Sequence, residues 1–155
     1  MSRKPFRSAI AILFVLAVAA PAAVAQSSSD ACSLLTQAQV SAAVSAQVSA
    51  SASADVTPTF KATCTWTAPG KIITLMTEGT DPFNADKTPI SPAMQIVPAP
   101  GIGDDAYYVV IGNMVSLLTK KGSTAFKTTV YCSKLPVATL ESMESALAQQ
   151  VASEL

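Results

Sequence analysis

The chain contains no histidine and only two arginines, Arg3 and Arg7. Histidine is the usual general base for an activated serine or cysteine, so its absence argues against Ser-His and Cys-His nucleophilic catalysis. Arginine is the side chain best suited to bidentate binding of phosphate. Beyond Arg7 the chain carries seven lysines against ten acidic residues, a net charge of about −3. A mildly acidic, arginine-free region binds polyanions poorly, so nucleic acid is not expected as a partner.

Metal and redox motifs are missing as well. The three cysteines, Cys32, Cys64 and Cys132, are widely spaced and form no C-x-x-C pair, the spacing typical of zinc sites and of redox-active dithiols. No S-x-x-K motif opens an expected helix. We therefore expect no cofactor and no catalytic residues. Because the fold alone can bring two carboxylates together, a carboxylate-dependent hydrolase stays the enzymatic alternative.

The first 25 residues have the three-part pattern of a secretory signal peptide. A basic start with Arg3, Lys4 and Arg7 is followed by an uncharged apolar run over 9–20 and by small residues that end at Ala25. The run has about a dozen residues, whereas a membrane-spanning helix needs roughly 20. We therefore expect cleavage after Ala25, a periplasmic or secreted protein, and no stable membrane span after cleavage.

These features divide the chain into a signal peptide (1–25), a flexible leader (26–31) and a single α+β domain (32–155). The mature chain of about 130 residues is long enough for one domain with a hydrophobic core.

In an oxidising compartment two of the three cysteines are expected to form a disulfide. The residues alone leave three pairings open. A Cys32–Cys64 bond would tie the N-terminal segment to the first expected strand and is favoured. A Cys64–Cys132 bond is the main alternative, because both residues lie on expected strands. The remaining thiol is expected to be buried.

The N-terminal half predicts a helix followed by a hairpin. The stretch 32–48 has apolar residues at helical spacing, with Thr36 as the N-cap. Residues 49–59, SASASADVTPT, have the composition of a loop. Residues 60–67 alternate between apolar and polar side chains, which is typical of a strand with one buried and one wet face. Residues 71–78 form the returning strand.

The C-terminal half predicts a long connection, three strands and a helix. The proline-rich segment 79–100 is expected to hold one short helix near Pro82–Lys87 and otherwise to be a connection. Turn residues divide 106–132 into a three-strand meander. The stretch 134–155 predicts an amphipathic helix, with Glu144 on the wet shoulder of its apolar stripe. The order predicts an α+β fold: one antiparallel sheet of about five strands with the N- and C-terminal helices on one face.

In the segment PAPGIGDDAYY, Gly101, Gly103 and Ala106 have the spacing of a dinucleotide-binding fingerprint. That motif requires a strand before it and a helix after it, whereas here prolines precede it and a β-branched, aromatic stretch follows. We interpret the segment as a tight turn in which glycine supplies a positive φ. Asp104 and Asp105 are candidate metal ligands, but adjacent carboxylates supply few of the six to eight oxygens that calcium takes, so no metal is expected.

Aromatic residues are the candidates for a ligand-binding platform: Phe60, Trp66, Phe83, Tyr107, Tyr108, Phe126 and Tyr131. Of these, Trp66, Phe83, Tyr107 and Tyr108 are chosen as the ligand-binding candidates. Adjacent tyrosines on a strand point to opposite faces, so one of Tyr107 and Tyr108 faces outward or into a groove. The alternative is that one tyrosine belongs to the core and the other to the ordinary surface.

Three stretches taken together, DACSLLTQAQVSAAV, CTW and PGIGDDAYY, resemble a group of exported bacterial domains of unknown function. The resemblance covers roughly residues 30–155. It implies a small exported α+β domain in which Cys32 pairs with Cys64, and it implies no activity. Gln39 stands where the group commonly has an acid, and Cys132 is an additional departure. No lipobox precedes Cys32, so the lipid anchor of many group members is not carried over.

We therefore expect a non-catalytic binding or interaction module of the cell envelope, with a small molecule or an envelope protein as its partner. The alternatives are the carboxylate-dependent hydrolase named above and a structural or stress-related envelope protein without a ligand.

Overall fold

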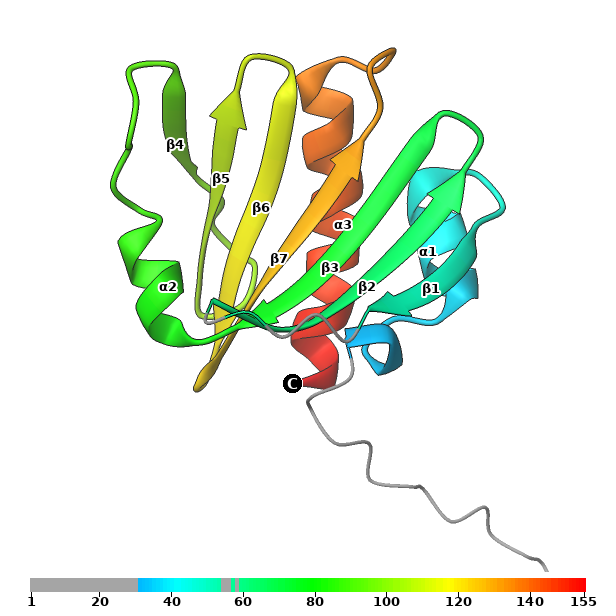
Figure 1. Ribbon diagram of the computed structural model, residues 1–155, viewed down its shortest axis with the longest axis horizontal. Helices are drawn as coiled ribbons and strands as arrows, with labels where there is room; N and C mark the ends of the chain where they lie inside the picture. The colour runs from blue at the N-terminus through cyan, green and yellow to red at the C-terminus, as the bar shows by residue number, and fades with distance from the viewer. Residues whose placement is uncertain (1–30, 54–56, 58) are drawn as a thin grey trace, which may run out of the picture.

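A computed structural model describes residues 31–53, 57 and 59–155 (Figure 1). The expected signal peptide and nearly all of the expected leader lie outside the described residues. The leader was expected to extend through Ala31, but Ala31 is fully buried at the start of the 3₁₀ helix η1 (Ala31–Ser33). The packed domain therefore begins at least one residue earlier than the sequence suggested.

The first α-helix, α1 (Gln37–Val44), begins where the sequence predicts. The hydroxyl of Thr36 accepts a hydrogen bond from the N–H of Gln39 at 3.2 Å, and the side-chain oxygen of Gln39 accepts one from the N–H of Thr36 at 2.7 Å. This reciprocal capping box supplies partners to two amides that the first turn would otherwise leave unpaired.

The described residues form one antiparallel sheet of seven strands in the order β1-β2-β3-β7-β6-β5-β4. The strands are β1 (Ser49–Ser53), β2 (Phe60–Ala68), β3 (Lys71–Glu78), β4 (Met94–Pro98), β5 (Asp105–Ile111), β6 (Met114–Lys121) and β7 (Thr124–Tyr131). The predicted hairpin is β2–β3, and the predicted meander is β5–β6–β7.

The expected number of about five strands was wrong because both edge strands were missed. Residues 49–53 pair with β2, although their Ser-Ala sequence was interpreted as a loop. Residues 94–98 pair with β5 inside the expected long connection, and Pro98 is the last residue of that strand. Proline lacks the N–H group that a strand inside a sheet donates to its neighbour. Because β4 is at the edge of the sheet, it tolerates Pro98.

The α-helices of the described residues cover the two faces of the sheet unequally (Figure 1). The C-terminal helix α3 (Val137–Glu154) packs across β6 and β7, and α1 packs against α3, so both lie behind the sheet in Figure 1. The short helix α2 (Thr80–Ala85), expected near Pro82–Lys87, packs on β6 and β7 from the other side. The face that carries α2 is called the open face below.

The main core lies between the sheet and the helices α1 and α3. Its largest fully buried side chains include Trp66, Leu75, Leu117, Phe126 and Leu147. A disulfide between Cys32 and Cys64, with Cα atoms 5.0 Å apart, joins η1 to β2 through this core and confirms the favoured pairing. The thiol of Cys132 is free and buried, as expected for the remaining cysteine.

Glu144 is not on a wet shoulder: its side chain is fully buried. Strands β6 and β7 pair only from Leu117↔Thr128 to Lys121↔Thr124, so the last residues of β7 lack a β6 partner. The carboxylate of Glu144 reaches from α3 into this gap and accepts a hydrogen bond from the N–H of Val130 at 2.8 Å. Glu144 is therefore buried because the N–H of Val130 requires an acceptor, although the helical pattern predicts an exposed side chain.

No helix in the described part of the chain has the length and apolar character of a membrane span.

Candidate functional site

The open face has a row of hydroxyl side chains that crosses four strands. Thr65 of β2 pairs with Thr74 of β3, which pairs with Thr129 of β7. The hydroxyls of Thr129 and Ser116, on β7 and β6, are hydrogen bonded at 2.9 Å. We call these four residues the hydroxyl row. Its β2 member belongs to the wet face that the alternation in residues 60–67 predicts.

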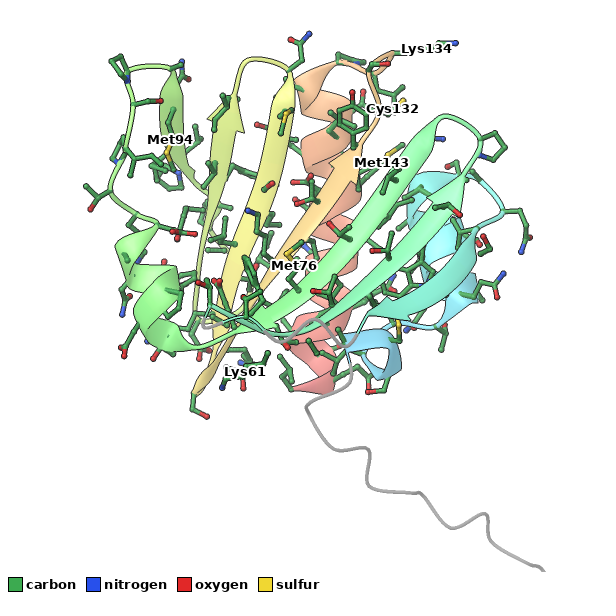
Figure 2. All side chains as sticks on the ribbon, in the orientation of Figure 1. Lys61, Met76, Met94, Cys132, Lys134 and Met143 are labelled. Atoms are coloured by element: carbon green, nitrogen blue, oxygen red, sulfur yellow. A yellow bond between two sulfur atoms is a disulfide. The ribbon has the colours of Figure 1, made fainter. Side chains whose placement is uncertain are left out.

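A second row, of apolar side chains, lies beside the hydroxyl row. Three of its residues are two positions along a strand from a member of the hydroxyl row, and the fourth is two positions from Val109, the β5 partner of Ser116. Side chains two positions apart on a strand point to the same face. Ile72 pairs with Tyr131, and Ile111 pairs with Met114. These four residues, called the apolar row, are between 45% and 56% exposed. Figure 2 labels Met76 on the same face, whereas Met143 belongs to α3 behind the sheet.

A surface hollow adjoins the β3–β7 end of the apolar row. It has a volume of about 390 Å³, and both Ile72 and Tyr131 line it. The remaining lining comes from the β2–β3 turn and from Ser133 after β7. The lining combines apolar side chains with the polar residues Thr67, Lys71 and Ser133, a composition that suits contact with another molecule.

The four aromatic residues chosen as ligand-binding candidates are all buried and do not form one platform. Trp66 and Tyr108 face the helices; the Tyr108 hydroxyl donates to the carbonyl of Glu141 at 3.1 Å and is hydrogen bonded to Ser145. Burial raises the pKa of Tyr108, and the hydrogen bond from Ser145 partly offsets that increase.

Phe83 and Tyr107 instead lie together on the open face, beneath α2. Their ring centroids are 5.0 Å apart, and the Tyr107 hydroxyl donates to the carbonyl of Phe83 at 2.5 Å. Leu118 and Ala125 complete this second cluster. The two adjacent tyrosines point to opposite faces of the sheet, as alternation along a strand requires: Tyr108 is in the main core, and Tyr107 lies beneath α2, where it lines the hollow described next.

Lys87, two residues beyond α2, lies directly over these two rings. Its ammonium nitrogen is 5.0 Å from the ring centroid of Phe83 and 5.6 Å from that of Tyr107, and it forms an ion pair with the carboxylate of Asp105. A hollow of about 260 Å³ adjoins the pair and is lined by Lys87, Ile96, Pro98, Asp105, Ala106 and Tyr107. We call it the Lys87 hollow.

Glu78, the last residue of β3, is fully buried on the open face, and neither of its carboxylate oxygens has a hydrogen-bond partner among the described residues. The pKa of Glu78 is raised from 4.5 to about 7, mainly by burial and also by the nearby Asp86, against an opposing effect of Lys127. Burial also raises the pKa of Tyr107, to which Asp86, Glu78 and Asp105 add. Acidic groups therefore converge on Tyr107.

The segment with fingerprint spacing is a turn, as interpreted. Gly101 and Gly103 have φ values of +86° and +59°. A Cβ at Gly103 would lie 2.5 Å from the carbonyl oxygen of Lys120, so only glycine fits there without a shift of the backbone.

Asp104 and Asp105 contact different partners. The carboxylate of Asp104 accepts the N–H of Gly122 at 2.8 Å and pairs with Lys121 at 3.1 Å. These contacts, the backbone hydrogen bond first, lower the pKa of Asp104. Asp105 pairs with Lys87 instead. Among the described residues, no group of three or more histidine, cysteine, aspartate or glutamate side chains is placed to hold a metal ion.

Tyr131 is one of the aromatic residues that the sequence offers as a platform, but it is outside the four chosen as ligand-binding candidates; its ring is half exposed on the open face. The signal was present in its alternation with Thr129, but its neighbours across the sheet follow only from the register of β3 with β7.

Compared with protein-family models, curated proteins and solved structures, the chain gives no significant match. The arrangement of the open face is therefore the basis for assigning a function.

Proposed function

We propose that this chain is an exported, non-catalytic binding module of the cell envelope that contacts a protein partner through the hydroxyl row and the apolar row. The observation that carries the proposal is the row of half-exposed Ile72, Tyr131, Met114 and Ile111 on a face that α1 and α3 leave uncovered. Ile72 and Tyr131 are cross-strand neighbours, as are Ile111 and Met114, and exposed apolar groups of this kind on one face of a domain commonly mark an interaction surface.

The composition of the two rows favours a protein surface over a small ligand. The hydroxyl row continues from β3 through β7 to β6. The apolar row consists of one pair on β3 and β7 and one pair on β5 and β6, on either side of the place where β6 and β7 stop pairing. Together they offer hydroxyl donors and acceptors next to two apolar pairs. Protein interfaces combine an apolar centre with a polar margin in this way, and tyrosine is a frequent anchor within them.

Export is supported by the signal-peptide pattern and by the Cys32–Cys64 disulfide, because disulfides persist mainly in oxidising compartments. The two buried glutamates do not provide the carboxylate pair of the hydrolase alternative. Glu78 is on the open face, whereas Glu144 reaches the sheet from α3 on the opposite side. The sheet lies between them, so they cannot act together as the acid and base of a hydrolase.

Site-specific photocrosslinking tests the proposal in cells that produce the protein. A benzophenone amino acid replaces Tyr131 in one variant and the exposed Gln149 of α3 in a control variant. We expect one discrete envelope protein to crosslink at Tyr131 and not at Gln149. Equal crosslinking at both positions, or only a diffuse background at Tyr131, would contradict the proposal.

A further inference from the structure

The surroundings of Lys87 have the composition of a binding site for an organic cation. Two aromatic rings, Phe83 and Tyr107, lie within 5.6 Å of its ammonium nitrogen, and the carboxylate of Asp105 pairs with it. Aromatic faces carry the negative end of the ring quadrupole, and they attract ammonium groups at this distance. Rings together with a carboxylate are the arrangement by which proteins recognise alkylammonium ligands.

The carboxyl groups of Asp86, Glu78 and Asp105 all act on the hydroxyl of Tyr107, so acidic side chains lie on the same side of the sheet as the rings. Two further lysines lie nearby: Lys127, which acts on Glu78, and Lys120, which pairs with Asp105 across β5 and β6. Among the described residues, Lys87 is the cation placed over the rings.

Lys87 is held less firmly than the groups it contacts. Phe83 is fully buried and Tyr107 nearly so, whereas the Lys87 side chain is 39% exposed. An exposed lysine on a flexible four-carbon stem gains little from a surface ion pair, so it can turn into solvent at small cost. The adjoining Lys87 hollow has space for the carbon part of a ligand against Ile96 and Pro98.

We propose that Phe83, Tyr107 and Asp105 form a binding site for a small organic ammonium compound, and that Lys87 occupies this site until the ligand displaces it. The site is separate from the hydroxyl and apolar rows, so it goes beyond the proposed function, and its test is independent of the protein partner. Only molecules in which Lys87 is displaced can bind the ligand. The apparent dissociation constant therefore equals the intrinsic one divided by the fraction of such molecules.

Chemical-shift titration of the purified domain tests the proposal. Wild type, Lys87→Ala and the control variant Lys134→Ala are titrated with choline, with butylamine, and with the uncharged choline analogue in which carbon replaces nitrogen. Lys134 is an exposed lysine that lies at the end of the molecule remote from α2 (Figure 2). The amide and ring signals of Phe83, Tyr107 and Asp105 report binding.

We expect Lys87→Ala to show a saturable response to at least one of the two ammonium compounds, on the order of tenfold tighter than wild type or Lys134→Ala. The uncharged analogue should give none, and a second change, Asp105→Asn, should remove most of the response. The tighter of choline and butylamine then identifies a quaternary or a primary ammonium ligand.

The proposal is overturned if neither ammonium compound gives a saturable response in Lys87→Ala. It is also overturned if the uncharged analogue binds equally well, or if Lys87→Ala binds no more tightly than Lys134→Ala. Lys87→Gln keeps most of the side-chain stem while removing the charge, and it gives the same three readouts should Lys87→Ala fail to fold.

Discussion

The carboxylate of Glu144, on α3, accepts a hydrogen bond from the backbone N–H of Val130, on β7, at 2.8 Å. This contact anchors the helix to the sheet at the place where β6 and β7 stop pairing. Because the Val130 amide is buried, removal of its acceptor leaves an unsatisfied donor in the core.

Replacement of Glu144 should separate the role of the acceptor from the role of the charge. Glu144→Leu should lower the free energy of unfolding by roughly 1–3 kcal/mol, because the Val130 amide loses its partner. Glu144→Gln keeps a side-chain oxygen in the same place and should cost much less. Urea denaturation of both variants measures the difference, and equal losses would show that the hydrogen bond to Val130 is not what stabilises this position.

The stability of the domain should fall as the pH rises from the acidic into the alkaline range. Burial raises the pKa of Glu78 from 4.5 to about 7 and that of Glu144 to about 8. Between 4.5 and these values the folded state holds protons that the unfolded state releases. The resulting stabilisation is complete below 4.5 and disappears as the pH passes through 7 and 8.

Thermal unfolding measured across this pH range shows whether stability falls as the pH rises. Glu78→Gln should remove the part of the pH-dependent loss of stability that extends from 4.5 to about 7, and Glu144→Gln the part that extends from 4.5 to about 8. Exposed Glu154 supplies the control, because Glu154→Gln changes the same group at the end of α3. A profile that rises with pH, or one that Glu78→Gln leaves unchanged, would refute the assignment.

Loss of the Cys32–Cys64 disulfide should destabilise the domain by roughly 3–4 kcal/mol, the chain-entropy value for a loop of this length. The paired variant Cys32→Ser/Cys64→Ser measures that loss in denaturant, with Cys132→Ser as the control that retains the bond. Non-reducing peptide mapping of the exported protein should recover Cys32 linked to Cys64. A map in which Cys132 forms the bridge would overturn this pairing.

Two glycines of the same turn should differ in their tolerance of a methyl group. Both have positive φ, so alanine at Gly101 incurs only backbone strain, on the order of 1 kcal/mol. Alanine at Gly103 would in addition meet the carbonyl of Lys120 and the side chain of Thr119. We expect Gly103→Ala to lower the melting temperature clearly more than Gly101→Ala; equal melting temperatures would contradict the close approach.

Sequence patterns predict the elements whose signals are local. Each of three such signals lies within one short segment of the chain. The Thr36 cap predicts the helix α1, the alternation in residues 60–67 predicts a strand of the β2–β3 hairpin, and the glycine turns in 106–132 predict the meander. Edge strands carry no such signal when their residues are small or include proline. Residues 49–53 and 94–98 are strands only because β2 and β5 offer open edges.

In the candidate site, too, local features can be predicted from the sequence and features that depend on other elements cannot. The wet face of β2 is visible in the sequence, but the continuation of Thr65 through Thr74 to Thr129 depends on strand order, which is not local. Glu144 was misplaced because its partner, Val130, belongs to another element. Helical periodicity cannot indicate where two strands of a sheet diverge.

The central claim is that the open face binds a protein partner, and the most direct test is the dissociation constant of the crosslinked partner, once purified. Tyr131→Ala removes the exposed ring of the apolar row and should have little effect on stability. An anchor residue of this kind typically contributes about 2 kcal/mol or more, so we predict a dissociation constant at least about thirtyfold weaker. Gln149→Ala should bind as wild type does. Equal affinities for wild type and Tyr131→Ala would contradict the account.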